Sequence, residues 1–152
     1  MTSNLEILLD GQQFKKIYEI KYDQILRSYG LTKLEIEILL FLESSKPSDT
    51  ARDIVGSRLF AKSHVSKAIT SLIDDGYVLG NPDEHDRRCI HLKLSDNAKQ
   101  IVKEAKEIRD NITGILFEGV SLEEKKIMEI VARKIANNIK ITLKHSEERA
   151  NE

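Results

Sequence analysis

The stretch that decides the fold, residues 62–73, reads Lys-Ser-His-Val-Ser-Lys-Ala-Ile-Thr-Ser-Leu-Ile. Its apolar residues recur at positions i, i+3, i+4, i+7 and i+8, which is the spacing of a buried helix face. They are Val65, Ala68, Ile69, Leu72 and Ile73, and a second helically spaced set, Ser63, Ser66, Lys67 and Thr70, lies opposite them. The stretch therefore predicts an amphipathic helix with one face in a core and the other open.

The residues on either side of this helix predict a compact structural unit. Before it, Ala51–Leu59 reads as a short helix, and a tight turn at Leu59–Ala61 joins the two. After it, Gly76 ends the helix, and two strand-like runs, Tyr77–Leu79 and Cys89–Leu94, flank the polar residues 81–88. Helix, tight turn, helix and hairpin is the order of a winged helix-turn-helix, whose second helix enters the major groove of DNA.

Further toward the N-terminus, two more helices are predicted. The first runs from about Leu5 to Ser28 and ends at Gly30. The second, Lys33–Glu43, follows a Thr-x-x-Glu capping box formed by Thr32 and Glu35. Its apolar residues point in nearly every direction, so we expect it to form the centre of the fold.

Toward the C-terminus, the pattern predicts two longer helices. Ser95 or Asp96 can cap a helix whose apolar residues alternate three and four apart, the period of a coiled coil: Ala98, Ile101, Ala105, Ile108, Ile112 and Ile115. A second capping box, Ser121 and Glu124, opens the last helix, which extends through Ile127, Val131, Ile135, Ile139 and Leu143 to a polar tail, residues 145–152.

Composition indicates a helix-rich globular chain. It has 152 residues, of which 40% are hydrophobic and 32% charged, a size that suits one core. No apolar run approaches the about 20 residues of a membrane-spanning helix, and the start lacks the order of a secretory signal, so we expect a cytoplasmic protein. The net charge of −1 argues mildly against nucleic acid, but residues 58–73 contain three basic residues and no acidic one.

The open face of the helix at Lys62–Ile73 is the candidate DNA-reading surface. Its side chains are short or cationic, so the backbone can approach base edges closely. Serine and threonine hydroxyls both donate and accept, whereas lysines suit guanine edges or phosphates. We expect DNA contacts from Lys62, Ser63, His64, Ser66, Lys67 and Thr70. Such a face is also typical of an ordinary solvated helix. The prediction of DNA binding therefore depends largely on the hairpin that follows.

The chain resembles the MarR family of regulators. The family's wing pattern, Asp-x-Arg-x-x-x-Leu-x-Leu-Thr, is matched by Asp86, Arg88, Leu92 and Leu94, with Ser95 in place of the threonine. Leu31–Thr32, and Leu72 with Gly76–Tyr77, also stand where the family has its Leu-Thr and Leu-x-x-x-Gly-Tyr. The resemblance spans about Phe14 to Leu143.

The resemblance implies how the wing meets DNA. Arg88 enters the minor groove, whose negative potential favours a guanidinium, and Asp86 pairs with that guanidinium to fix its direction. Arg87 meets phosphate. The turn at Leu59 and Ala61 departs from the family, which often has a glycine and a small capping residue there, so the helix start is expected to lack a capping hydroxyl unless Ser63 supplies one.

The resemblance also implies a homodimer on a pseudo-palindromic DNA operator. We expect a single domain, with residues 31–95 as the winged-helix core and residues 1–29 and 96–145 as dimerisation helices. The expected role is a repressor that a small-molecule effector releases from DNA. Tyr18, Tyr22 and Phe41 are candidates for the effector pocket, although core packing is the better explanation for each of them.

Other functions find less support. His85, Cys89 and His91 could suggest a metal or redox site, but their spacing is not that of a structural zinc site and only one thiol is present. Redox sensing by Cys89 stays an alternative, as does a winged-helix adaptor that binds protein instead of DNA. No enzyme motif is found, so we expect no catalytic function and no cofactor.

Overall fold

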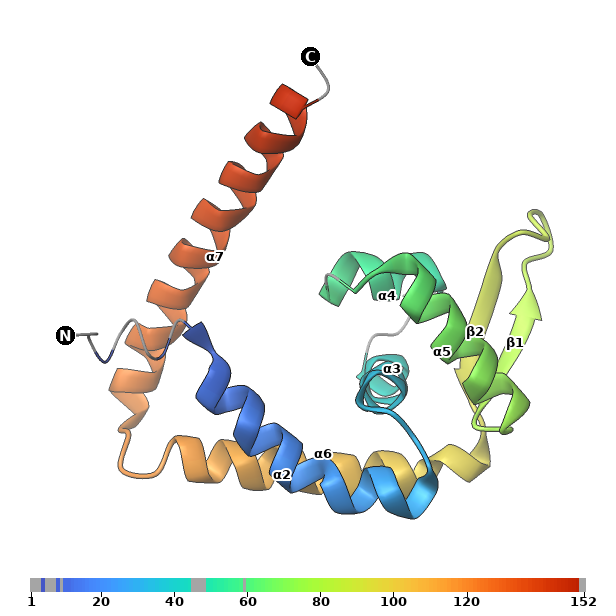
Figure 1. Ribbon diagram of the computed structural model, residues 1–152, viewed down its shortest axis with the longest axis horizontal. Helices are drawn as coiled ribbons and strands as arrows, with labels where there is room; N and C mark the ends of the chain where they lie inside the picture. Colours follow the sequence, from blue (N-terminus) through green and yellow to red (C-terminus); the bar gives the residue numbers. More distant parts are fainter. Residues whose placement is uncertain (1–3, 5–7, 9, 45–48, 59, 151–152) are drawn as a thin grey trace. The chain divides into compact units, whose positions relative to one another are not determined.

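The computed structural model describes residues 4, 8, 10–44, 49–58 and 60–150, and it describes side chains for all of these except 57, 58 and 147–150. Within this part of the chain the structure is mainly helical, with a two-stranded antiparallel sheet, as predicted (Figure 1). The chain divides into two compact units, residues 1–113 and 114–152. The elements of the first unit are α2 (Gln12–Tyr29), α3 (Lys33–Ser44), α4 (Ala51–Arg58), α5 (Lys62–Asp74), β1 (Val78–Pro82), β2 (Ile90–Leu94), η1 (Asp96–Ala98) and most of α6 (Lys99–Leu116).

The helix predicted from Leu5 to Ser28 is interrupted at Gly11, and Leu8 and Asp10 before it are helical. Leu5 lies outside the described residues, and α2 begins only at Gln12 because Gly11 before it has a φ of 70°. That left-handed conformation suits glycine and interrupts a right-handed helix. The C-terminal end agrees with the prediction, since Gly30 has a φ of 67° and its N–H bonds the carbonyl of Leu26.

α3 forms the centre of the first unit, as predicted. The backbone N–H of Thr32 donates to the Glu35 carboxylate at 2.7 Å, and the N–H of Glu35 donates to the Thr32 hydroxyl at 3.3 Å. This reciprocal capping box satisfies backbone donors that the first turn cannot use itself. Six apolar side chains of α3 are buried: Ile36, Ile38, Leu39, Leu40, Phe41 and Leu42.

The helix-turn-helix consists of α4 and α5. α4 follows a capping box that was not predicted from the sequence, in which Asp53 accepts from the N–H of Thr50 at 3.0 Å. Leu59 in the predicted turn lies outside the described residues, and Ala61 caps α5 with no side-chain hydrogen bond. The predicted buried face of α5 is confirmed except at Ile73, which is 37% exposed. Figure 1 shows α5 beside the hairpin.

β1 and β2 form the wing with Val78 opposite Leu94 and Pro82 opposite Ile90. The first strand extends three residues beyond the predicted Leu79, because Gly80, Asn81 and Pro82 continue the ladder. Ser95 stands at the N-cap position of η1, as predicted, but its side chain makes no capping bond. Its hydroxyl donates to the carbonyl of Gly76 at 2.7 Å, and its N–H donates to the carbonyl of Tyr77 at 3.0 Å. Both bonds close the base of the wing.

α6 packs against α2 and α3 within the first unit. The buried Tyr22 donates its hydroxyl to the carbonyl of Ala105 at 3.3 Å. Arg109 pairs with Glu37 of α3 at 3.2 Å. The predicted apolar strip of α6 is buried at Ala98, Ile101, Ala105 and Ile112 but exposed at Ile115.

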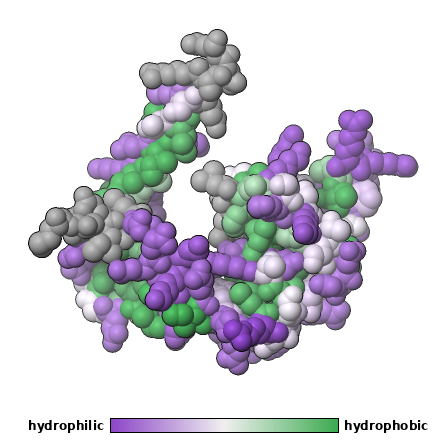
Figure 2. Space-filling view, in the orientation of Figure 1, coloured by the Kyte–Doolittle hydropathy of each residue, from purple (hydrophilic) through white to green (hydrophobic). Residues whose placement is uncertain are grey.

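The second unit contains α7 (Leu122–Ala150). The predicted capping box is present, because the N–H of Ser121 donates to the Glu124 carboxylate at 2.8 Å. The helix continues through the residues predicted as a polar tail, up to Ala150. Figure 2 shows an apolar surface along α7, where the exposed side chains include Leu122, Ile127, Ile130, Val131, Ile139 and Leu143. Among the described residues, no helix has the length and apolar character needed to cross a membrane.

Candidate nucleic-acid interface

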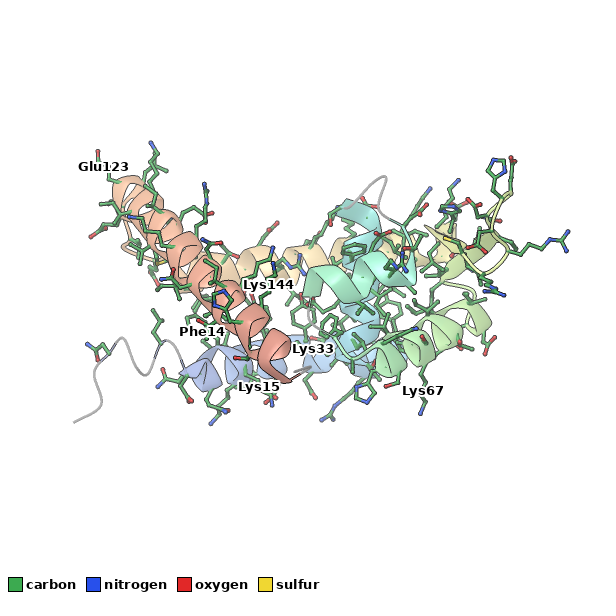
Figure 3. The ribbon with its side chains drawn as sticks, turned by 90° about the horizontal axis from the view of Figure 1, so that it is seen from above. Phe14, Lys15, Lys33, Lys67, Glu123 and Lys144 are labelled. Carbon is green, nitrogen blue, oxygen red and sulfur yellow. The ribbon has the colours of Figure 1, made fainter. Side chains whose placement is uncertain are left out.

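The open face of α5 presents the predicted DNA-reading side chains to solvent. The burial of Val65, Ala68, Ile69 and Leu72 fixes the rotation of the helix about its axis. Figure 3 shows Lys67 projecting from α5 away from the core. The hydroxyl of Thr70 donates to the carbonyl of Ser66 at 3.0 Å, so its lone pairs remain available to accept. The exposed set is Lys62, Ser63, His64, Ser66, Lys67 and Thr70.

The tip of the wing is a turn organised by one aspartate. The carboxylate of Asp83 accepts from the backbone N–H groups of His85 and Asp86, each at 2.8 Å. The N–H of Cys89 donates to the carbonyl of Asp86 at 2.8 Å and so closes the turn. This arrangement leaves Asp86, Arg87 and Arg88 exposed.

The contact between Asp86 and Arg88 differs from the expected one. A carboxylate oxygen of Asp86 accepts from the backbone N–H of Arg88 at 3.0 Å, whereas the resemblance implied a pair with the guanidinium. Two residues is the usual separation for such an aspartate-to-backbone bond in a turn. Asp86 therefore positions the backbone from which the Arg88 side chain extends.

The wing packs on α5 at a glycine. A Cβ atom placed on Gly80 would lie 3.1 Å from Cγ2 of Ile90 and 3.3 Å from Cδ1 of Ile73. An isolated glycine within a strand often marks such a close approach, so Gly80 was a signal in the sequence from which this packing could have been predicted. The approach also explains Ile73, which packs against the wing and not in the centre of the unit.

A charged cluster joins the wing to the segment before α4. His91 Nδ1 lies 2.7 Å from Asp49 Oδ1, and His91 Nε2 lies 3.0 Å from Asp83 Oδ2. The bond with Asp49, followed by that with Asp83, raises the pKa of His91 above its usual 6.5. The bond from His91 is the main cause that lowers the pKa of Asp83 to about 2. Neither aspartate was predicted from the sequence as a functional residue.

The geometry gives no support to a metal site or to redox sensing by Cys89. Among the described residues, no group of three or more histidine, cysteine, aspartate or glutamate side chains is arranged to hold a metal ion. The carboxylates beside His91 contact opposite ring nitrogens, so the three groups do not face one common point. Cys89 is a half-buried free thiol.

The three candidate effector residues lie in packed surroundings. Tyr22 and Phe41 are buried, and the Tyr18 ring stacks on that of Tyr22 with their centroids 6.1 Å apart. None of the three is among the residues that line two cavities of the first unit. The larger cavity, about 900 Å³, lies between α3, β2 and α6 and combines apolar side chains such as Leu42 and Val102 with lysines and carboxylates.

Comparison with known proteins finds similarity to one family of regulators. Residues 29–88 match the model of the MarR family. The transcriptional repressor MprA of Escherichia coli is 23% identical over 122 residues, which are 77% of this chain and 67% of that protein.

Solved structures show the same fold. The structure of the Staphylococcus aureus MepR–DNA complex matches with a TM-score of 0.75 and 19% identity, over 91% of this chain and 99% of that one. The organohalide-sensing transcriptional regulator RdhR-CbdbA1625, in its 2,4-dichlorophenol bound form, matches with a TM-score of 0.69 and 22% identity, over 90% and 82%. Helix-turn-helix and wing are therefore assigned on both sequence and fold.

Proposed function

We propose that the chain, whose residues 29–88 match the MarR family model, is a regulator of that family: a sequence-specific transcription repressor that binds double-stranded DNA as a homodimer. The observation that carries the proposal is the polar face of α5, exposed beside a wing tip with two exposed arginines. Helices of this kind read base edges in the major groove, while a wing reaches the adjacent backbone and minor groove.

Each part of the surface has a distinct role in the proposal. Ser63, Ser66, Lys67 and Thr70 contact base edges, and Lys62 and His64 contact bases or phosphates at the start of the helix. Arg88 enters the minor groove and Arg87 pairs with phosphate. Asp86 holds the turn through the backbone N–H of Arg88. A net charge of −1 is compatible with this role because affinity depends on where the cations lie.

The homodimer is supported by the unpartnered apolar side chains of α7. Leu122 is 69% exposed and Ile127 61% exposed. A soluble protein rarely leaves so many large apolar side chains in water along one helix, so a second copy is the occupant we propose. Residues 1–29 and 96–145 would supply the dimerisation helices. Two-fold symmetry then requires a pseudo-palindromic operator.

Repression and release by a small molecule complete the proposal. The relative MprA is named a repressor, and one similar regulator was solved with 2,4-dichlorophenol bound. The named relatives are regulators and not enzymes, in line with the expectation of a non-catalytic protein. The cavity between α3, β2 and α6 is the place we propose for an effector, in preference to Tyr18, Tyr22 and Phe41.

Selection of bound sequences from a random pool of DNA duplexes tests the function directly. We expect a pseudo-palindromic consensus, bound with an affinity that falls steeply as salt is raised. The double variant Lys67→Ala, Arg88→Ala should lose the selected sequence. Its matched control is Lys15→Ala, Arg27→Ala, which removes the same charge from exposed positions of α2. If no sequence were enriched and binding were insensitive to salt, the adaptor alternative would replace this proposal.

A further inference from the structure

One histidine of the wing bridges two carboxylates from different parts of the chain. We call His91, Asp49 and Asp83 the His91 clamp. Asp49 precedes α4, Asp83 follows β1, and His91 is on β2. Their distances, 2.7 Å to Asp49 and 3.0 Å to Asp83, are those of charge-assisted hydrogen bonds.

The clamp requires a protonated imidazole. An ionised carboxylate only accepts hydrogen bonds, so each of the two contacts needs an N–H on the ring nitrogen that faces it. A neutral imidazole has only one N–H, and its second nitrogen would present a lone pair to a carboxylate. Loss of the proton from His91 to water therefore breaks one of the two hydrogen bonds and leaves a ring lone pair facing a carboxylate.

Both ends of the clamp hold parts of the proposed DNA-binding surface. On one side, the second carboxylate oxygen of Asp83 accepts from the N–H groups of His85 and Asp86 in the turn that carries Arg87 and Arg88. On the other side, the carbonyl of Asp49 accepts from the N–H of Leu92 at 2.9 Å, directly before the capping box of α4. His91 thus links the wing-tip turn to the start of the helix-turn-helix.

The surroundings allow His91 to exchange its proton with solvent. Its side chain is 42% exposed, that of Asp49 36% and that of Asp83 30%. Lysines face the same cavity, but Lys106 is paired with Glu43 at 3.1 Å and Lys99 with Asp96 at 2.8 Å. The other charged groups that line it are Lys93 on β2 and Lys103, Glu107 and Asp110 on α6. The two carboxylates in direct contact outweigh these more distant groups, so the pKa of His91 is raised.

We propose that His91 is a positioning residue for the wing, which in its protonated form fixes the wing-tip arginines for DNA and makes operator affinity fall as the pH rises. This inference rests on the proposed DNA-binding function. Below the raised pKa of His91 both hydrogen bonds are made and the wing is held in one orientation. Above that pKa one of them breaks and the wing is held less firmly. DNA must then order the wing when it binds, which makes the binding free energy less favourable.

The first test does not involve DNA. A proton NMR titration of the full-length protein should show the His91 ring with a pKa above 6.5, and Asp49→Asn or Asp83→Asn should each lower it. A His91 pKa at or below that of an unstructured histidine, or one unchanged in both variants, overturns the clamp.

The second test measures operator affinity against pH by fluorescence anisotropy at constant ionic strength, between about pH 5.5 and about pH 8.5. His64 and His85 also lie on the proposed surface, so the parent protein carries His64→Gln and His85→Gln. We expect its Kd to be higher at the alkaline end of this range than at the acidic end. The total rise is about tenfold for each pH unit by which DNA binding raises the pKa of His91. His91→Gln should abolish most of this dependence.

Asp83→Asn separates the clamp from a general effect of DNA phosphates on a nearby histidine. A phosphate effect would leave the pH dependence intact in this variant, whereas the clamp requires it to shrink. If the parent bound its operator but His91→Gln had the same pH profile, the inference would fail and the proposed function would stand. If the parent bound no DNA at any pH, the proposed function would fail, and the NMR titration would still decide the clamp.

Discussion

The carboxylate of Asp86 accepts a hydrogen bond of 3.0 Å from the backbone N–H of Arg88, and the guanidinium of Arg88 extends into solvent. The side chain and the backbone of Arg88 thus have separate roles at the wing tip. The backbone bond fixes where the side chain starts, and the free guanidinium is available to DNA.

Arg88→Ala should weaken operator binding by about 1–3 kcal/mol and reduce the salt slope by about one, as expected when a cation no longer reaches the groove. The fold should be unchanged because the side chain is exposed. Anisotropy titrations at several salt concentrations measure both quantities. Arg27→Ala, at another exposed arginine, on α2, is the control; light scattering verifies that it has the oligomeric state of the parent, and it should then bind DNA as the parent does.

Lys67→Ala and Thr70→Ala should change which sequence is preferred, because both residues are exposed on the open face of α5. Removing a hydrogen bond to a base edge reduces discrimination at that position of the site by about 1–3 kcal/mol. Repeating the selection from a random pool with each variant measures this. An unchanged consensus in both variants would show that α5 does not read the sequence through these positions.

Features set by short-range spacing were predictable. The capping boxes at Thr32 and Ser121 are four-residue patterns, and the burial of α3 follows from its apolar residues on every side. Two local signals were present but unused. Gly11 lies inside the predicted helix, and a glycine there often adopts a left-handed conformation that ends a helix. Thr50 and Asp53 have the spacing of a capping box, with aspartate in place of the usual glutamate.

Interactions between distant residues could not be predicted in the same way. His91 and Asp49 are 42 residues apart, and Tyr22 and Ala105 are 83 apart. Neither pair shares a periodic pattern, since their approach depends on how separate elements pack. The exposed polar face of α5 was predictable because one helix carries it, whereas the contacts of His91 that join the wing to the segment before α4 depend on the fold.

Thr50→Ala should destabilise the protein by about 1 kcal/mol, the usual effect of losing a capping hydroxyl. The hydroxyl accepts from the N–H of Asp53 at 3.3 Å and donates to its carboxylate at 2.7 Å, so the variant makes neither bond. Urea denaturation followed by circular dichroism gives the free energy of unfolding. Thr142→Ala on α7, whose hydroxyl bonds only the carbonyl of Asn138 within its own helix, is the control with a smaller effect.

Ile127→Asp or Ile139→Asp should convert the protein to a monomer. Both side chains are more than half exposed on α7, so a charge there costs little in one chain but is unfavourable in a dimer interface. Light scattering at micromolar concentration measures the mass, and circular dichroism verifies helix content. The control is Lys134→Asp, a change on the same helix at a charged position. A parent protein that is already monomeric would contradict the two-fold arrangement.

The His91 clamp should also give stability a defined pH window. Asp83 has a folded pKa of about 2 against an ordinary 3.8, so its contribution is present above 3.8 and is lost as the pH falls toward 2. His91 has a folded pKa raised above 6.5, so its contribution is complete below 6.5 and is lost as the pH rises through the folded value. Both contributions coincide between pH 3.8 and pH 6.5.

The difference in urea midpoint between the parent and His91→Gln should be largest in this window and shrink on both sides of it. Using the difference between the two proteins cancels the other carboxylates whose pKa values are lowered, such as Asp53 and Glu124. A difference that stays constant up to alkaline pH would mean that the imidazole stabilises the wing through packing and not through its charge.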